Sequence, residues 1–376
     1  MPQAGEAQLN DQRERLLLAP YAMFSCDSLG REHAETEHPY RGVFQRDRDR
    51  ILHSSAYRRL SGKMQVFTGE MGDYHRTRLT HTQEVATVAR TIGRALRLNE
   101  DLIEALALVH DIGHPPYGHA GEDALDECVA DIGGFSHNRF ALTIVKELEI
   151  RYPQFRGLNL SREVLAGQVS RIDKSEPRLN LLLEVQLVDA ADSTTYDAHD
   201  TDDAVKLGLV TLDEMAGLAL VRESLEFVRS TFTNLSTDML RKAVVHRLIN
   251  LQVTDMIREC VDGLMRFGFS TATEAMASEF RIGPSSELAE KKKELETFLY
   301  ERVYRHPDLI SVRKQGQERL KAMYEGYCQN PDFIPQHHRV RIENTGVRRT
   351  AVDYIAGMTD KFCEETYNGL FRANKN

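Results

Sequence analysis

Apolar residues recur at helical spacing through most of this 376-residue chain. In residues 79–96 the apolar side chains follow the i, i+3, i+4, i+7 pattern that places them on one face of a helix: Leu79, Val85, Val88, Ala89, Ile92 and Leu96. The alternation typical of half-buried strands is scarce. Further helices are predicted at 101–112, 138–150, 161–171, 179–200, 211–230, 237–266, 285–303, 311–328 and 347–366. The pattern therefore predicts an all-α fold.

Turn signals separate these helices, but no linker is long or biased enough to require a break between independent domains. We expect one continuous helical structure in three regions. An N-terminal basic segment covers residues 1–64, a chemically rich core covers 65–210, and a plainer helical region, 211–376, packs on that core.

Composition excludes several classes of protein. With 41% hydrophobic and 28% charged residues, the chain is neither disordered nor collagen-like. Its longest apolar runs are about five residues, far short of the roughly 18 that a membrane span requires. The five cysteines are odd in number and lack a CxxC spacing, which predicts free thiols rather than disulfides or a zinc ribbon. We expect a cytoplasmic protein.

Charge is distributed unevenly around a net value of −9. Residues 41–97 hold twelve Lys and Arg against five Asp and Glu, whereas residues 184–203 hold seven acidic residues and no Lys or Arg. An acidic segment beside a basic one indicates a bound cation that in turn holds an anionic ligand.

The clearest chemical signal is the pair His110-Asp111 at the end of the almost wholly apolar segment 101–112, just before Gly113. A carboxylate in such surroundings costs several kcal/mol unless a cation or donor meets it. Together with His81 and Asp192, the pair makes a mixed nitrogen and oxygen set that suits Mn²⁺, Fe²⁺, Co²⁺ or Mg²⁺. Taken singly, each of these residues is more simply interpreted as an ordinary buried side chain.

The following loop, GHPPYGHAGEDAL, carries His119 and Glu122 three residues apart. If a helix begins near Ala120, the carboxylate faces the imidazole and orients it for proton transfer. Without the neighbouring His-Asp pair, a proline turn with surface histidines would be the better interpretation.

In residues 188–203, four polar residues recur at intervals of three or four and share one helical face: Asp189, Asp192, Tyr196 and Asp200. Such a stripe is usually solvated, but the apolar run NLLLEVQLV before it indicates a helix that crosses the interior. A metal at Asp192 would leave Tyr196 and Asp200 to bond a sugar hydroxyl.

Taken together, these segments resemble the HD-domain phosphohydrolases, and more closely the dGTPase-like deoxynucleoside triphosphate triphosphohydrolases. The resemblance covers most of the chain in the order 47–67, 75–90, 107–125, 133–140, 188–203 and 353–362. It implies an all-α HD-domain helical bundle with an additional C-terminal helical region. Within the three regions above, residues 65–210 are then the HD catalytic core.

The resemblance also implies roles for matching positions. The implied ligands of a divalent metal, Mn²⁺ or Mg²⁺ first and Fe²⁺ or Co²⁺ as alternatives, are His81, His110, Asp111 and Asp192. The groups implied at the phosphates are His119 with its partner Glu122, His114, His137 and Arg78. Those implied at the deoxyribose are Gln65, Tyr196 and Asp200. The basic segment and the pair His246-Arg247 are candidates for the β- and γ-phosphates, although a solvent-facing pair explains His246-Arg247 equally well.

The implied reaction is the hydrolysis of dGTP and other dNTPs to deoxynucleoside and inorganic triphosphate by metal-activated attack at the α-phosphate. Ser193 follows the metal aspartate where many relatives carry Asp or Lys, which changes the charge beside the metal and bears on base preference. The resemblance further implies a homo-oligomer, a tetramer or hexamer, and a dNTP activator.

Two other functions remain open on the sequence. An HD site could act on a nucleoside monophosphate or a cyclic nucleotide, although the basic segment would then have little to bind. Alternatively, arginines interleaved with Tyr40, Phe44, Tyr57 and Phe67 could stack single-stranded bases in a nucleotide-sensing, nucleic-acid-binding protein.

Overall fold

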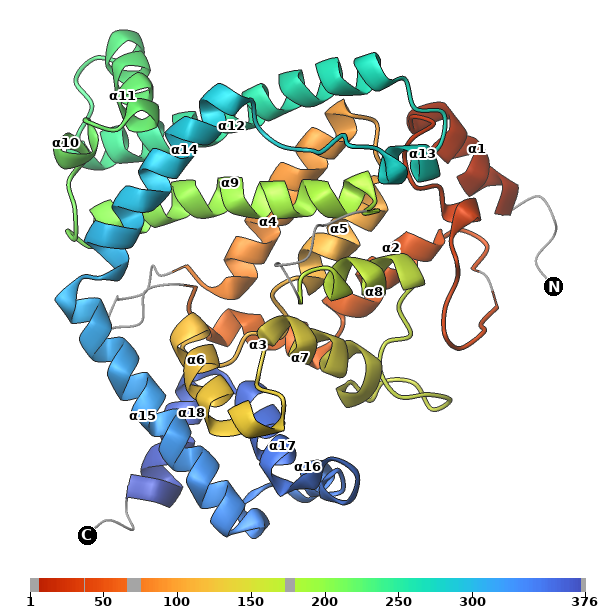
Figure 1. Ribbon diagram of the computed structural model, residues 1–376, viewed down its shortest axis with the longest axis vertical. Coiled ribbons are helices and arrows are strands. Elements are labelled where there is room, and N and C mark those ends of the chain that lie inside the picture. The colour runs from red at the N-terminus through yellow and green to blue at the C-terminus, as the bar shows by residue number, and fades with distance from the viewer. Residues whose placement is uncertain (1–6, 37, 66–75, 173–179, 373–376) are drawn as a thin grey trace.

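The structure is a computed structural model that describes residues 7–36, 38–65, 76–172 and 180–372. Within these residues the regular elements are helices, and β pairing is limited to isolated bridges. The predicted all-α fold is confirmed (Figure 1). Phe67 lies outside the described residues.

Three helices form the centre of the molecule: α4 (Arg78–Ala95), α5 (Glu100–Val109) and α9 (Leu183–Lys206). Helix α4 packs against both α5 and α9, and α9 also packs against α5 and α12 (Thr237–Phe267) (Figure 1). Local chemistry sets where these helices begin. The Thr77 hydroxyl caps α4 and exchanges hydrogen bonds with Thr80, and the Asn99 side chain accepts from Leu102 N at the start of α5.

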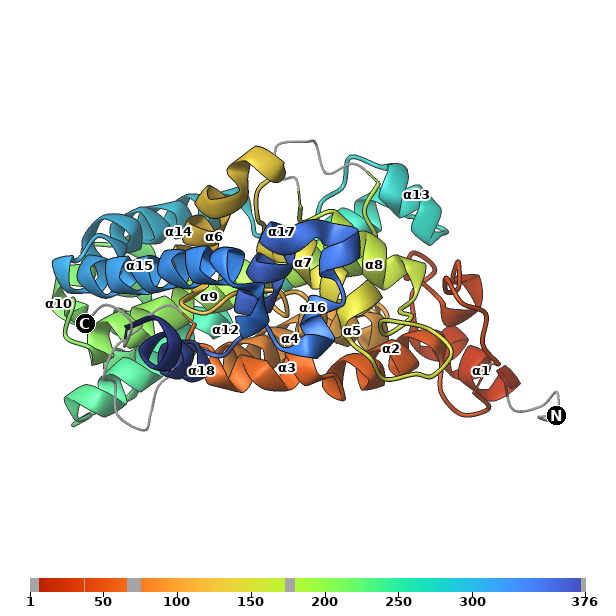
Figure 2. The ribbon, with the colours of Figure 1, turned by 90° about the horizontal axis from the view of Figure 1, so that it is seen from below.

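The later helices enclose this centre. Helix α15 (Pro307–Gln329) packs on α6 (Gly118–Val129) and on α17 (Ile342–Ala356), so that the end of the chain covers the segment that follows α5 (Figures 1 and 2). The remaining α-helices are α1 (Ala7–Leu17), α2 (Val43–Leu52), α3 (Ser55–Arg59), α7 (His137–Thr143), α8 (Arg162–Val169), α10 (Leu212–Met215), α11 (Ala219–Thr231), α13 (Ala272–Ala277), α14 (Ser286–Phe298), α16 (Gln336–Arg339) and α18 (Asp360–Thr366).

Two clusters of buried apolar side chains hold the helices together. The larger draws on residues from Ala22 to Cys363 and so joins the N-terminal segment, the centre and the last helices. The smaller, from Ala198 to Leu309, packs the second half of α9 against α10, α11, α12 and α14. The region boundaries near residues 64 and 210 stay predictions.

Two of the predicted helices are interrupted in the structure. The segment predicted at 211–230 forms α10 and α11. The capping box of Thr211 and Glu214 starts α10, and the extended backbone of Leu218 separates it from α11. The segment predicted at 347–366 is divided at Gly357, and the Thr359 side chain then caps α18 by accepting from Phe362 N. Periodicity continued through both breaks, so it could not reveal them.

None of the helices in the described ranges is long and apolar enough to cross a lipid bilayer. All five cysteines are free.

Candidate active site

Three helices bring four predicted metal ligands together. Helix α4 supplies His81, α9 supplies Asp192, and the chain leaving α5 supplies His110 and Asp111. We call these four residues the helix cluster. The Nε2 atoms of His81 and His110 lie 3.1 and 3.6 Å from Asp192 Oδ1. His110 Nε2 also lies 3.6 Å from Asp111 Oδ1.

The donor atoms of the helix cluster are prepared for a cation. His110 Nδ1 donates to the carbonyl oxygen of Ala107 at 2.6 Å, which leaves the lone pair of Nε2 free. That Nε2 atom is buried and has no hydrogen-bond partner in the described part of the chain. Burial lowers the pKa of His110 and favours the neutral imidazole that metals bind. An orphaned nitrogen facing two carboxylates fits a divalent metal.

The carboxylates of the helix cluster are ionised. Burial alone would raise the pKa of Asp111, but Arg78 and the neighbouring imidazoles outweigh it and hold that pKa well below its usual range. Arg78 Nη1 donates to Asp111 Oδ2 at 2.8 Å. Burial likewise opposes ionisation of Asp192, yet His110 and His81 lower its pKa. Ionised carboxylates are the protonation state that a divalent metal requires of its oxygen ligands.

A second set of imidazoles adjoins the first. We call His114, His119, Glu122 and His137 the loop cluster. Glu122 Oε1 lies 2.7 Å from His137 Nδ1, and Glu122 Oε2 lies 3.3 Å from His119 Nδ1. The ring of His114 stacks on that of His137 with centroids 3.8 Å apart, and His114 Nε2 lies 3.2 Å from Asp111 Oδ1. His114 therefore links the two clusters.

Backbone packing explains why His137 lies here although it is distant from the His-Asp pair in the sequence. Gly113 packs so closely on α7 that an added Cβ would lie 2.0 Å from the carbonyl oxygen of His137. Only glycine permits this approach. The next loop turns through Tyr117, whose φ of 64° is left-handed, and Asp360 Oδ1 holds it by accepting from Tyr117 N at 3.1 Å.

A cavity of about 360 Å³ opens onto both clusters. Its lining also contains Arg78, Gln65, Tyr196 and Ser193, together with Asn138, Arg171 and Asp189. Gln65 Oε1 is buried without a hydrogen-bond partner in the described ranges, and Tyr196 is half-buried. The structure thus brings imidazoles, carboxylates and two arginine side chains to one cavity.

Four predicted residues do not line this cavity, and one of them, Glu122, reaches it only through its contacts with His119 and His137. Asp200 is buried behind it, where one carboxylate oxygen accepts from the Tyr304 hydroxyl. His246 is exposed on α12, and the Arg247 guanidinium lies 4.0 Å from the centre of the Phe227 ring. Burial and the neighbouring Asp203 raise the pKa of Asp200 well above its usual value.

Sequence reasoning missed two basic residues that matter here. Arg171, just after α8, lies 2.5 Å from Asp189 Oδ1 and 3.9 Å from Asp192 Oδ2 at the cavity wall. Lys63, counted above with the basic segment, is buried and donates to the carbonyl oxygens of His114 and Ala356 at 2.6 and 2.9 Å. Neither position carries a local signal, because the partners of both side chains are remote in sequence.

Several arginines of the basic segment are already paired with carboxylates, so fewer of them can bind phosphate than the composition indicates. Arg48 pairs with Asp49 and Asp101, and Arg50 pairs with Glu35. Of the aromatic residues proposed above to stack bases, Phe44 and Tyr57 are buried in the core, where they cannot meet a nucleic acid.

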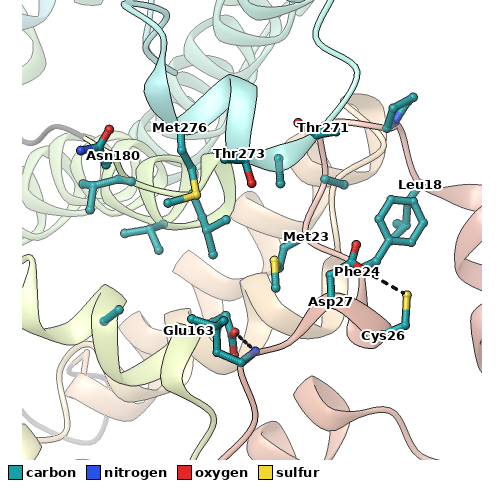
Figure 3. A pocket seen from close by; sticks show the side chains of 18 of the residues that line it. Leu18, Met23, Phe24, Cys26, Asp27, Glu163, Asn180, Thr271, Thr273 and Met276 are labelled. Atoms are coloured by element: carbon teal, nitrogen blue, oxygen red, sulfur yellow. Dashed lines mark hydrogen bonds between the residues drawn. The ribbon is translucent and has the colours of Figure 1, made fainter.

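A larger cavity, of about 810 Å³, lies between the N-terminal segment, α8 and α13 (Figure 3). Its wall mixes apolar side chains such as Met23, Phe24 and Met276 with polar ones such as Asn180 and Thr273. It shares no lining residue with the cavity of the two clusters. Converging titratable groups, rather than volume, mark the candidate active site.

Comparison with known proteins identifies the family of this chain. Residues 78–197 match the HD domain, and residues 282–369 match the phosphohydrolase-associated domain. The chain is 38% identical over 370 residues to a deoxyguanosinetriphosphate triphosphohydrolase-like protein of Geobacter metallireducens, covering 96% of each chain. Proteins with the same name from Leptospira interrogans and Caulobacter sp. are 39% and 40% identical, and the alignments cover 96% and 94% of this chain and 97% and 96% of the relatives.

Proposed function

Because this chain belongs to the deoxyguanosinetriphosphate triphosphohydrolase-like family and is thereby an HD-domain hydrolase, we propose that it hydrolyses deoxynucleoside triphosphates to deoxynucleoside and inorganic triphosphate. The observation that carries this proposal is the meeting of the helix cluster and the loop cluster at one cavity. A metal site alone would support hydrolysis of many esters. A second set of imidazoles beside it supplies the proton transfer that an alkoxide leaving group needs.

We assign the helix cluster as the ligands of a divalent cation, with Mn²⁺ or Mg²⁺ as the proposed ions. Such an ion supplies Lewis-acid polarisation of a phosphoryl oxygen and of the attacking water. The chain contributes the orientation of the ligands, through the Ala107 carbonyl on His110 and the Arg78 guanidinium on Asp111.

Water attack at the α-phosphorus forms one P–O bond and breaks the bond to the nucleoside 5′-oxygen, which must gain a proton. We assign His119 as the donor of that proton, since its side chain is 67% exposed and reaches the cavity. Glu122 holds Nδ1 of His119 and so leaves Nε2 for the transfer. Two interactions lower the pKa of Glu122 despite its burial, one with His119 and one with His137, and its carboxylate stays ionised as this role requires.

The remaining cavity residues suit the rest of the nucleotide. We assign Arg78 and Arg171 to phosphate oxygens, because a guanidinium matches a phosphate with paired hydrogen bonds. We assign His114 and His137 to the same phosphates. Gln65 and Tyr196 are assigned to the deoxyribose, with Asp200 behind them. The proposed roles of His246 and Arg247 at the outer phosphates would require a movement or a second chain, since neither lines the cavity.

The deciding experiment is product analysis with purified protein, Mn²⁺ or Mg²⁺, and each dNTP in turn. The expected products are deoxynucleoside and intact triphosphate in equal amounts. Pyrophosphate with dNMP, orthophosphate alone, or faster turnover of a dNMP than of any dNTP would contradict the proposal.

The oligomeric state of the protein and its activation by a nucleotide are predictions that rest on the same family membership. We propose a homo-oligomer whose rate depends on a second dNTP as activator. Light scattering with and without dGTP measures the oligomeric state. Rate curves with mixtures of two dNTPs measure activation by the second nucleotide. A monomer with hyperbolic kinetics for every dNTP pair would contradict both.

A further inference from the structure

The loop cluster has the composition of a metal site in its own right. Ligand atoms of His114, His119, Glu122 and His137 all lie within 4.8 Å of one another. The other such group in the described residues is His81, His110 and Asp192, and the two share no residue. Nothing in the proposed hydrolysis requires a cation at the loop cluster.

Ring geometry selects which members could bind one ion together. The rings of His114 and His137 are stacked, with an interplanar angle of 16° and centroids 3.8 Å apart. An ion in the plane of one ring therefore lies out of the plane of the other, and both cannot be ligands. The rings of His119 and His137 are inclined at 74°, and both Nδ1 atoms face the Glu122 carboxylate. His119, Glu122 and His137 are therefore the members of the loop cluster that could bind one ion together.

Two imidazoles and one glutamate are a donor set that zinc uses in open, three-ligand sites. Mg²⁺ prefers oxygen ligands in octahedral geometry and is poorly served by this set. The site is accessible, because the side chain of His119 is 67% exposed, whereas Glu122 and His137 are each 17% exposed. The backbone N–H of His137 also donates to Glu122 Oε1 at 2.9 Å, which holds the carboxylate in place.

We propose that His119, Glu122 and His137 form a second metal site, selective for Zn²⁺ over Mg²⁺, whose occupation inhibits the enzyme. Zinc takes the place of the proton at Nδ1 of His119, and that proton is released to solvent. The metal-bound ring can then no longer become the imidazolium that donates a proton from Nε2. The inhibitory part rests on the proposed function, whereas zinc binding does not. Filling the site lowers the Mn²⁺-supported rate by about 10²-fold, the scale of general acid–base catalysis.

Zinc stoichiometry tests the binding part. After equilibrium dialysis and elemental analysis, the wild-type chain is expected to hold two Zn²⁺ per chain. The double variant His119→Ala, His137→Ala is expected to hold one, as is the double variant His81→Ala, Asp192→Asn. Glu122→Gln preserves shape and is expected to bind the second ion more weakly, which keeps the test valid if the double variants fold poorly by circular dichroism.

A matched control uses the neighbouring imidazoles of His337 and His338, whose ring centroids are 4.4 Å apart outside the cavity. The variant His337→Ala, His338→Ala is expected to keep both zinc ions. One zinc per wild-type chain, two in the His119 and His137 variant, or loss of an ion in this control would each overturn the site.

Activity separates the two proposals. If no dNTP is hydrolysed with Mn²⁺ in zinc-free buffer, the proposed function fails while the stoichiometry still reports on the site. If wild-type protein with two bound zinc ions and excess Mn²⁺ hydrolyses dNTP at its zinc-free rate, the inhibitory role is overturned.

Discussion

The helix cluster and the loop cluster border one cavity but are held in opposite ways. The helix cluster is built from α4, α9 and the chain that leaves α5, and its imidazoles are almost fully buried. Among the described residues, none forms a hydrogen bond with His110 Nε2. The loop cluster is built at the starts of α6 and α7, and its carboxylate already binds both His119 and His137. Burial with an unsatisfied nitrogen favours a resident cation, whereas internal pairing near solvent favours proton exchange.

The largest expected effect comes from removing a ligand of the helix cluster. Asp192→Ala should abolish Mn²⁺ binding at the helix cluster and lower kcat/KM by about 10³-fold or more, because a lost Lewis acid is worth several kcal/mol. Metal content and dNTP turnover measure this. His199→Gln is the control, since its buried ring lies 5.8 Å from that of His81 outside the ligand group, and metal should remain. A metal-loaded, active Asp192→Ala enzyme would contradict the assignment.

A substitution in the loop cluster should separate chemistry from metal binding. Glu122→Gln is expected to lower kcat by about 10²-fold, within the range of general acid–base catalysis, and to leave the Mn²⁺ dissociation constant unchanged. Single-turnover kinetics with Mn²⁺ titration measures both quantities. A parallel loss of Mn²⁺ affinity would mean that the two clusters act as one.

Substitution of Arg171 should have a smaller effect, and it should change the affinity for substrate rather than for metal. Arg171→Ala is expected to raise KM for dNTPs about tenfold or more, because a hydrogen bond to a charged group contributes about 1.5–3 kcal/mol. Arg171→Lys should retain part of the affinity, since the charge remains without the paired donors. Unchanged KM in both variants would place the phosphates elsewhere.

Lys63 should give the smallest effect, on stability, because its only hydrogen bond to the loop cluster among the described residues is to the backbone carbonyl of His114. Burial lowers the pKa of Lys63 to about 7. An unfolded lysine keeps its proton to about pH 10.4, so the unfolded chain binds more protons between these values and folding is favoured as pH rises.

Urea unfolding of wild type and Lys63→Met at pH 7 and pH 9 measures this difference. The difference between the unfolding free energies of wild type and variant should change in favour of wild type by up to about 1.4 kcal/mol for each unit of rising pH. A gap that is constant with pH would show that Lys63 titrates normally.

Much of the fold was accessible from local pattern alone. The predicted helix at 79–96 corresponds to α4, and that at 237–266 to α12, because long amphipathic periods and end caps are local properties. The helix predicted at 211–230 was wrong as a single element, since the backbone is extended at Leu218 between α10 and α11.

By itself, the sequence determined the helical class, the donor types and the pairing of His110 with Asp111, all of which are set by residues close together in the chain. Only the tertiary structure decided that His81 meets Asp192 across 111 positions, that Gly113 admits His137, and that Lys63 is buried rather than free for phosphate. The physical reason is that periodicity records which face of a helix is apolar, whereas packing of one helix on another decides which polar groups converge.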